Sequence, residues 1–202
     1  SKKDMSALTQ RMSEYRSILG VNKTHLLGTF VDNHDNPRFL SESSDSQLLS
    51  SAVVFSLMAE GIPIVYYGTE QYFSGADDPY CRERLWARGA YSNTTKLYRD
   101  IRILNDLRAK TQLWNQPMID HATDGSFYAF SRGPVLTALT NEGSSSGKLS
   151  RVVSSHPYNI GDVVCNAFYP TDCVKVTDQG VIIELIDGES KVFLPQQQLL
   201  TL

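Results

Sequence analysis

The sequence has no apolar run that approaches the ~20 residues a helix needs to span a bilayer. It also lacks a dense run of lysine and arginine, and its formal net charge is only -3 over 202 residues. Neither a membrane-spanning helix nor a polyanion-binding surface is therefore expected. What is present, 41% hydrophobic, 20% charged and 10% aromatic residues, is typical of a globular protein with enough apolar material for a core.

Cysteine is also scarce, with residues at positions 81, 165 and 173 only. Cys165 and Cys173 are close in a strand-rich region and could close a small disulfide loop, which would leave Cys81 as the odd one. The sequence alone does not decide the pairing. Two glycosylation sequons, at Asn22 and Asn93, agree with an oxidising compartment.

The chain does not open with an initiator methionine and an apolar signal segment, because its first residues are Ser1-Lys2-Lys3-Asp4. Three interpretations stay open. The chain was processed, or it is a piece of a longer protein, or it is an expression product numbered from one.

The first 115 residues alternate between helical and extended patterns. Apolar residues at helical spacing from Met5 to Leu19 predict a helix that stops at Gly20. The elements expected next are a strand over 26–31, a helix over about 45–60, a strand over 62–67, a polar loop over 68–91 and a helix over 95–110. For the middle helix, Ser44 and Gln47 have capping-box spacing, and Gly61 suits the carboxyl-terminal cap.

Alternating helices and apolar strands predict an α/β fold with a parallel sheet that helices cover on both faces. Two strands cannot form a stable parallel sheet alone. We therefore expect partner strands upstream, and with them an exposed sheet edge in this chain.

After about residue 115 the pattern becomes all-β. Short β-rich runs are separated by Gly, Asn and Asp turn signals, and the runs lie at 126–131, 135–140, 148–153, 163–168, 174–177, 181–186 and 191–194. Asp187-Gly188 is a hairpin signal, and 143–147 reads as a serine-rich loop. The chain is therefore divided into 1–115 and 116–202, the second part being an antiparallel β-sandwich.

Two polar groups follow the two predicted parallel strands, at the sheet edge where working residues gather. The first is the run Asp32-Asn33-His34-Asp35. The second comprises Glu70, Gln71, Tyr72, Asp77, Asp78, Arg82 and Glu83. The plain alternative is two solvated loops, with Asp78 and Arg82 as a surface ion pair of little energetic value.

Two other chemistries are disfavoured. A metal site at His34 and Asp35 would need further ligands, and the other three histidines lie in different contexts. Cys81 is expected to be inert, because no histidine near it in the sequence could act as its base.

The run Phe30-Val31-Asp32-Asn33-His34-Asp35-Asn36-Pro37-Arg38-Phe39 resembles the fourth sequence region of the α-amylase family of glycoside hydrolases, in particular its fungal type. The later run from Gly61 to Gly68 is similar to the same subgroup, as are Glu70-Gln71, Gly75, Asp78-Pro79, Arg82-Glu83 and Leu85-Trp86. The order and spacing of both blocks agree, and the likeness is clear over about 25–110.

The resemblance implies a (β/α)8 barrel whose seventh and eighth strands are 26–31 and 62–67, followed by an antiparallel domain. Asp35 then corresponds to the third catalytic carboxylate, which stabilises the transition state by holding sugar hydroxyls and helping to distort the ring. His34 corresponds to a histidine that binds the same sugar. Asp78 and Arg82 correspond to residues that bind the neighbouring glucose.

The family implies that the nucleophile and the acid/base come from the fourth and fifth strands, which this chain does not contain. Its structural calcium ligands also lie upstream, so we expect calcium in the full-length protein with no ligands here. We expect a secreted monomer that acts on α-glucans such as starch and maltooligosaccharides. The isolated chain is expected to be inactive.

Three residues depart from the family pattern. Asp32 stands where glutamate is usual, Thr69 where glutamine is frequent, and Cys81 where asparagine or another polar residue is usual. These departures bear on substrate preference. The alternatives to an endo-acting hydrolase are a transglycosylating or cell-wall glucan-processing relative and a non-catalytic glucan-binding module.

Overall fold

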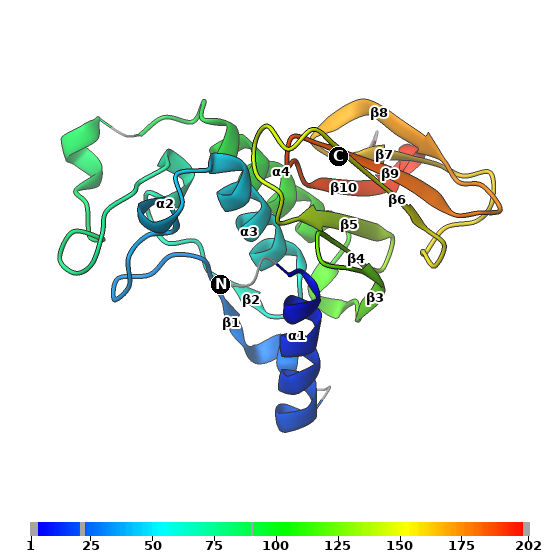
Figure 1. The fold of residues 1–202 in the computed structure, drawn as a ribbon, viewed down its shortest axis with the longest axis horizontal. Helices are drawn as coiled ribbons and strands as arrows, with labels where there is room; N and C mark the ends of the chain where they lie inside the picture. Colours follow the sequence, from blue (N-terminus) through cyan, green and yellow to red (C-terminus); the bar gives the residue numbers. More distant parts are fainter. Residues whose placement is uncertain (1–3, 21–22, 90, 200–202) are drawn as a thin grey trace.

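A computed structural model describes residues 4–20, 23–89 and 91–199, and Asn22 of the first sequon lies outside them. The helical part contains the α-helices α1 (Ser6–Leu19), α2 (Phe39–Glu42), α3 (Ser46–Met58) and α4 (Lys96–Lys110). In Figure 1 it lies beside a β-rich part. None of the helices in the described ranges is long and apolar enough to cross a membrane.

The two predicted parallel strands are present but much shorter than expected. β1 is Gly28–Thr29 and β2 is Ile62–Pro63, and they pair in parallel with Gly28 opposite Ile62. Within the described residues, each of these two strands has one neighbour in its sheet. Apolar side chains remain exposed here, with Phe30 49% and Ile62 53% accessible. The predicted open sheet edge is thus a feature of the structure.

Helix α3 begins at a different cap from the one predicted. The Asp45 side chain accepts hydrogen bonds from the backbone N–H groups of Gln47 and Leu48 at 2.8 and 3.3 Å, so the Ser44–Gln47 capping box is wrong. The predicted carboxyl-terminal cap is also wrong, because Ala59 occupies that position. A Cβ on Gly61 would lie 2.7 Å from the Leu27 carbonyl oxygen, so the glycine permits close approach to β1 instead.

Helix α4 agrees with its prediction. It runs from Lys96 to Lys110, and the Thr95 hydroxyl caps it by accepting a hydrogen bond from Tyr98 N at 3.2 Å. Leu97, Leu104 and Leu107 lie on its buried face. Helix α1 also ends before Gly20, as its apolar spacing predicts.

The second half consists of antiparallel strands in two sheets. One sheet has six strands in the order β3-β4-β5-β10-β7-β8, and the other pairs β6 with β9. Their bounds are β3 Met118–Thr123, β4 Phe127–Arg132, β5 Val135–Thr140, β6 Lys148–Val153, β7 Val163–Asn166, β8 Tyr169–Lys175, β9 Val181–Ile186 and β10 Lys191–Pro195. The last element is the short helix α5, Gln196–Leu199.

Three expectations for this half need correction. β3 is missing from the predicted strands, and β8 begins at Tyr169 instead of 174. The Asp187-Gly188 turn forms, with positive φ at both residues and a hydrogen bond from Glu189 N to Ile186 O. It does not make a hairpin, however, because β9 and β10 belong to different sheets. The residues of the turn itself determine its conformation, whereas the strand with which β9 pairs depends on distant parts of the chain.

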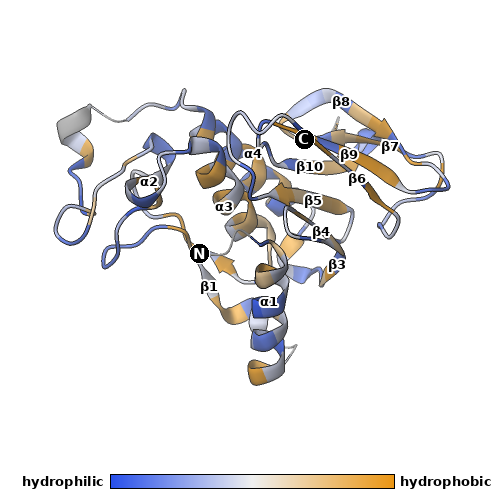
Figure 2. Ribbon diagram, in the orientation of Figure 1, coloured by the Kyte–Doolittle hydropathy of each residue, from blue (hydrophilic) through white to orange (hydrophobic). Residues whose placement is uncertain are grey.

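Two apolar clusters cover the two faces of the six-stranded sheet. Tyr128, Phe130 and Val192 of the sheet pack with residues of α1, α3 and α4 in one cluster. Phe127, Leu136 and Phe193 pack with β6 and β9 in the other. Strands β4 and β5 are therefore buried along their whole length, and hydrophobic residues follow these strands and α3 in Figure 2. The division of the chain at 115/116 stays a prediction.

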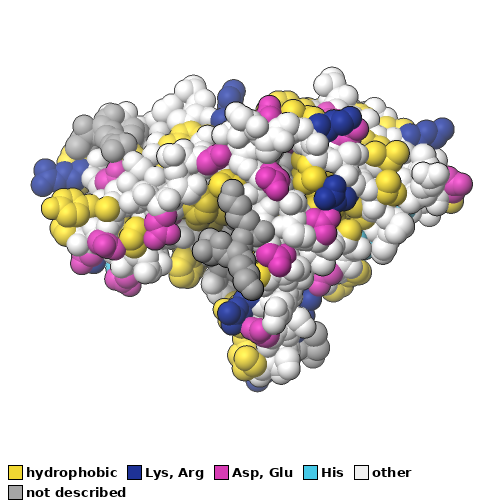
Figure 3. Space-filling view, in the orientation of Figure 1, with side chains coloured by type: hydrophobic (Ala, Val, Ile, Leu, Met, Phe, Trp, Pro, Cys, Tyr) yellow, Lys and Arg dark blue, Asp and Glu magenta, His cyan; other side chains and the backbone are white. Residues whose placement is uncertain are grey.

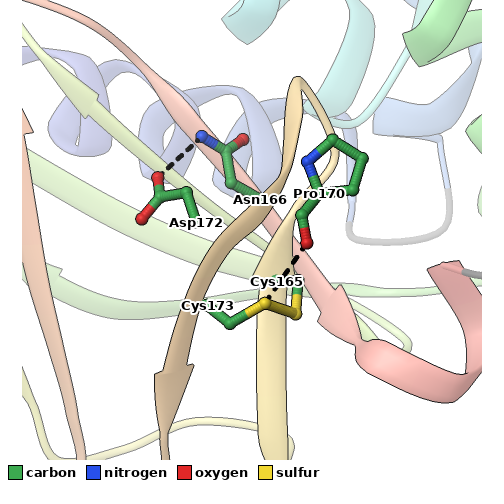
Figure 4. The surroundings of a disulfide bond; sticks show 5 residues. All are labelled: Cys165, Asn166, Pro170, Asp172 and Cys173. Carbon is green, nitrogen blue, oxygen red and sulfur yellow. Dashed lines mark hydrogen bonds between the residues drawn. A yellow bond between two sulfur atoms is a disulfide. The ribbon is translucent and has the colours of Figure 1, made fainter.

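The disulfide bond joins Cys165 to Cys173, which face one another across β7 and β8 (Figure 4). Asn166 Nδ2 donates to Asp172 Oδ2 at 3.1 Å beside it. The Cys173 sulfur also lies 3.3 Å from the Pro170 carbonyl oxygen, although a disulfide sulfur has no hydrogen to donate. Cys81 is a buried free thiol. The pairing that the sequence left open is thus Cys165 with Cys173.

Candidate functional site

Two loops meet at the ends of β1 and β2, one over 32–38 and one over 68–89. Their contact begins at Asp32, which is buried. Asp32 Oδ1 accepts a hydrogen bond from Phe39 N, and Oδ2 accepts one from the Thr69 hydroxyl, both at 2.8 Å. Two of the departures from the family pattern are therefore in direct contact, and together they join the loops.

Arg38 is the fully buried cation at the centre of this junction, with 0% of its surface accessible. Its Nε donates to the Cys81 carbonyl oxygen at 3.0 Å, and Nη2 donates to the Tyr67 carbonyl oxygen at 2.9 Å. Its charge is balanced by Asp32 at 3.6 Å and by Glu83 at 2.9 Å. One side chain thus binds both loops and two carboxylates.

Aromatic rings surround the same guanidinium group. Its carbon lies 4.6 Å from the ring centroid of Tyr66, 5.2 Å from that of Tyr67 and 5.3 Å from that of Phe73. These contacts are attractive because the ring faces carry negative electrostatic potential. Burial, followed by the hydrogen bond and charge of Tyr67, raises the pKa of Tyr66 to about 12, although the Arg38 charge opposes this.

His34 and Asp35 lie at the exposed surface above this junction, with 65% and 68% of their side chains accessible. Asn33 Oδ1 shapes the loop by accepting hydrogen bonds from the N–H groups of Asp35 at 2.8 Å and Asn36 at 2.9 Å. His34 Nε2 lies 3.4 Å from Asp35 Oδ1. Both side chains are available to a ligand from solvent.

Arg82 connects the second loop to the first. Its Nε donates to the His34 carbonyl oxygen at 3.1 Å, and its Nη2 lies 3.1 Å from Asp78 Oδ2. The ion pair forms across two successive turns, because Tyr80 N donates to Asp77 O and Arg82 N to Pro79 O. Asp78 and Arg82 thus form an exposed ion pair, an alternative considered from the sequence.

Cys81 lies closer to a histidine than the sequence suggests. Its thiol donates to the His34 carbonyl oxygen at 3.2 Å. This contact does not contradict the expectation that no histidine acts as a base for Cys81. The contact is to a carbonyl group and not to the imidazole, so it supplies no base for the thiol.

The structure brings His34, Asp35, Asp78 and Arg82 into one connected exposed set. Glu83 belongs instead to the buried junction, where it also accepts a hydrogen bond from Gly75 N at 2.9 Å. Glu70 and Gln71 bind the residues before α4, through a Thr95 hydroxyl bond to Glu70 O and a Gln71 side-chain bond to Ser92 O. Arg38 lies within the run 30–39 that resembles the family, but sequence reasoning assigned it no role, and no local signal places Glu83 beside it.

A metal has no fitting site in the described part of the chain. No group of three or more His, Cys, Asp or Glu side chains there is placed to hold a metal ion. On the face shown in Figure 3, acidic and basic side chains are interspersed without a large basic patch.

Comparison with known proteins identifies the family. The model of the alpha-amylase catalytic domain matches residues 2–128. This chain belongs to the alpha-amylase family. The alpha-amylase of Saccharomycopsis fibuligera is 34% identical over 205 residues, which cover 94% of this chain and 38% of that protein.

Solved structures agree with this membership. The structure of an alpha-amylase from Malbranchea cinnamomea superimposes with a TM-score of 0.88 at 32% identity, and the match covers 97% of this chain and 42% of that one. A gamma-CGTase from alkalophilic Bacillus clarkii has a TM-score of 0.78 at 22% identity, over 94% and 29% of the two chains, and shows a shared fold alone. This alpha-amylase family chain spans less than half the length of these proteins.

Proposed function

We propose that this chain is part of a retaining glycoside hydrolase that cleaves internal α-1,4-glucosidic bonds of starch and related α-glucans. The observation that carries the proposal is the connected set of His34, Asp35, Asp78 and Arg82. These four residues come from two loops that follow adjacent parallel strands. In α/β barrels, substrate-binding residues lie at this edge of the sheet.

The proposal places β1 and β2 as the seventh and eighth strands of a (β/α)8 barrel. Their parallel pairing supports this, as do the exposed apolar side chains of Phe30 and Ile62, which six further strands would cover.

The chemistry of the exposed set suits a neutral saccharide. Sugar hydroxyls both donate and accept hydrogen bonds, so the Asp35 carboxylate accepts from them while the His34 imidazole bonds to the same ring. Asp35 would stabilise the transition state, in which the ring is distorted and these hydrogen bonds tighten. Asp78 and Arg82 would hold the neighbouring glucose. The hydrogen bond from Arg82 to His34 O would hold the two subsites at a set distance.

Residues 1–202 alone are proposed to be inactive. In the family, the nucleophile and the acid/base stand on the fourth and fifth strands, and retaining cleavage needs both. Calcium would be bound by parts of the full-length protein outside these residues. The disulfide bond supports secretion, because disulfides persist in oxidising compartments. The full-length protein is proposed to be a monomer.

A chimera tests the proposal. Residues 1–202 would replace the aligned segment of the Saccharomycopsis fibuligera alpha-amylase, and the purified chimera and the isolated chain would be assayed on starch. We expect hydrolysis by the chimera and none by the chain. A folded but inactive chimera would count against the proposal, and so would starch hydrolysis by the chain alone. Long transfer products in place of shorter glucans would favour the transglycosylating alternative.

A further inference from the structure

A second candidate site lies away from the two loops, at the junction of the helices with the sheets. A cavity of about 150 Å³ opens there between the first turns of α3 and α4 and the residues that lead into β8 and β10. Its volume is about ten times the ~10–15 Å³ that one water molecule needs. It can therefore hold several waters or one small solute.

The walls of the cavity are fixed by hydrogen bonds between α3 and the sheets. The Ser190 hydroxyl donates to the Ser51 hydroxyl at 3.0 Å, and Ser51 donates to the Thr140 carbonyl oxygen at 2.9 Å. The α3 cap Asp45 also accepts two hydrogen bonds from Ser144, at 2.8 and 3.0 Å. The cavity is thus a built feature between elements that are tied together.

The charges around the cavity disfavour an anion. Lys96 lines it, but its ammonium group lies 2.5 Å from Asp100 Oδ2. Asp187 and Glu189 add two carboxylates to the wall, and Glu189 is 3.3 Å from Lys191. A metal ion is disfavoured as well, because the described residues form no metal-ligand group of three.

The uncharged groups of the wall suit a polyhydroxylated ring. Gln47 and Ser50 present an amide and a hydroxyl, which can donate to hydroxyl groups and accept from them, and the Ser190 hydroxyl, whose hydrogen is donated to Ser51, can still accept. Phe168 and Tyr169 add aromatic rings, and Tyr169 is 50% accessible. An aromatic face at a wet opening can stack on the C–H face of a sugar, while the carboxylates accept from its hydroxyls.

We propose that this cavity binds one neutral pyranose unit, separately from the Asp35 site. The pyranose class follows from the size and chemistry of the walls. Its identification as a glucose unit of an α-glucan rests on the proposed function. Binding here would hold a second part of the polysaccharide on the same protein.

The test is titration of the 202-residue chain with maltose and with glucose, followed by calorimetry or by amide NMR shifts. We expect saturable binding in the millimolar range, which is normal for a contact of this size. Ser50→Leu places a larger apolar side chain in the cavity and should weaken maltose binding at least tenfold. Tyr169→Ala truncates a half-exposed ring and should weaken it several-fold without endangering the fold.

Two controls locate the binding. Tyr15→Ala removes the same ring from the accessible surface of α1, and Asp35→Asn alters the other site. Neither should change the cavity's affinity, and circular dichroism confirms folding of each variant. No saturable binding to the unmodified chain would overturn the inference, and so would binding that Asp35→Asn abolishes but Tyr169→Ala leaves intact. The starch assay of the chimera is independent, so either proposal can fail alone.

Discussion

Replacing Arg38 by methionine should strongly destabilise the chain. Methionine keeps much of the apolar packing against Phe73 but removes the charge and all the donors. Arg38 has no accessible surface, and the buried Asp32 and the partly buried Glu83 would both lose the Arg38 cation. Removing one partner of a buried ion pair costs about 3–5 kcal/mol.

The hydrogen bonds place the expected cost in the upper half of that range. The carbonyl groups of Cys81 and Tyr67 both lose a charged donor, and each such bond contributes roughly 1.5–3 kcal/mol. These contributions overlap with the ion-pair figure because they belong to one side chain. We therefore expect a loss of about 4 kcal/mol, which is a large fraction of the ~5–15 kcal/mol that stabilises an ordinary domain.

Urea unfolding followed by circular dichroism measures this change. The matched control is Arg102→Met, which removes an exposed arginine from α4 and should stay within about 0.5 kcal/mol of the unmodified chain. Adding Glu83→Gln to Arg38→Met removes one of the two carboxylate charges that face Arg38. The double variant should therefore lose about 1–3 kcal/mol less than the sum of the single variants. Strictly additive losses, or a loss below about 1 kcal/mol for Arg38→Met, would refute the reasoning.

Two further predictions concern stability and pH. Asp45→Ala should cost about 1–2 kcal/mol, because it removes the α3 cap and the contact with Ser144, whereas Asp178→Ala in an exposed turn should be nearly neutral in the same urea assay. Burial, followed by repulsion from His156, lowers the pKa of His121 despite the opposing charge of Asp120. Stability should therefore be full above about pH 6.5 and should fall as the pH drops towards the folded-state pKa, because the unfolded chain protonates first. His121→Gln should flatten the Tm difference between about pH 8 and pH 5, and equal slopes in both proteins would contradict the assignment.

Local signals in the sequence are sufficient to predict the long helices α1, α3 and α4 and most of the antiparallel strands, but not the short helices α2 and α5. The predicted helix over 95–110 corresponds to α4, and the β-rich run over 181–186 corresponds to β9. The local sequence does not predict which strands pair with one another. Whether the chain near Ile62 forms a long strand depends on its neighbours in the sheet, and Asp187-Gly188 makes its turn without deciding which sheet follows.

β3 was missed for a specific reason. The polar residues Asp120 and His121 interrupt the alternation of apolar and polar residues that predicts a strand. At that point the register of β3 against β4 shifts, and His121 is the extra residue of a β-bulge. Its ring then contacts the Ser131 and Ser155 hydroxyls at 2.7 and 3.0 Å. Such contacts depend on distant segments, so the local spacing of apolar and polar residues cannot predict them.

In the candidate site, too, some residues could be predicted from the sequence, whereas contacts between distant segments could not. The resemblance supplied His34, Asp35, Asp78 and Arg82, and the structure brings these four together. The resemblance gave no role to Arg38, whose importance arises from the carbonyl groups of two other segments. The contact between Asp32 and Thr69 was equally hidden, because 37 residues separate them in the sequence.

The most direct test of the central claim is the turnover number on starch of the chimera with Asp35→Asn. If Asp35 stabilises the transition state, kcat should fall by at least about 10²–10³, the usual cost of losing one such interaction, while KM changes far less. The matched variant Asp178→Asn, in an exposed turn, should keep the parental kcat. An unchanged kcat for Asp35→Asn in a folded chimera would contradict the account.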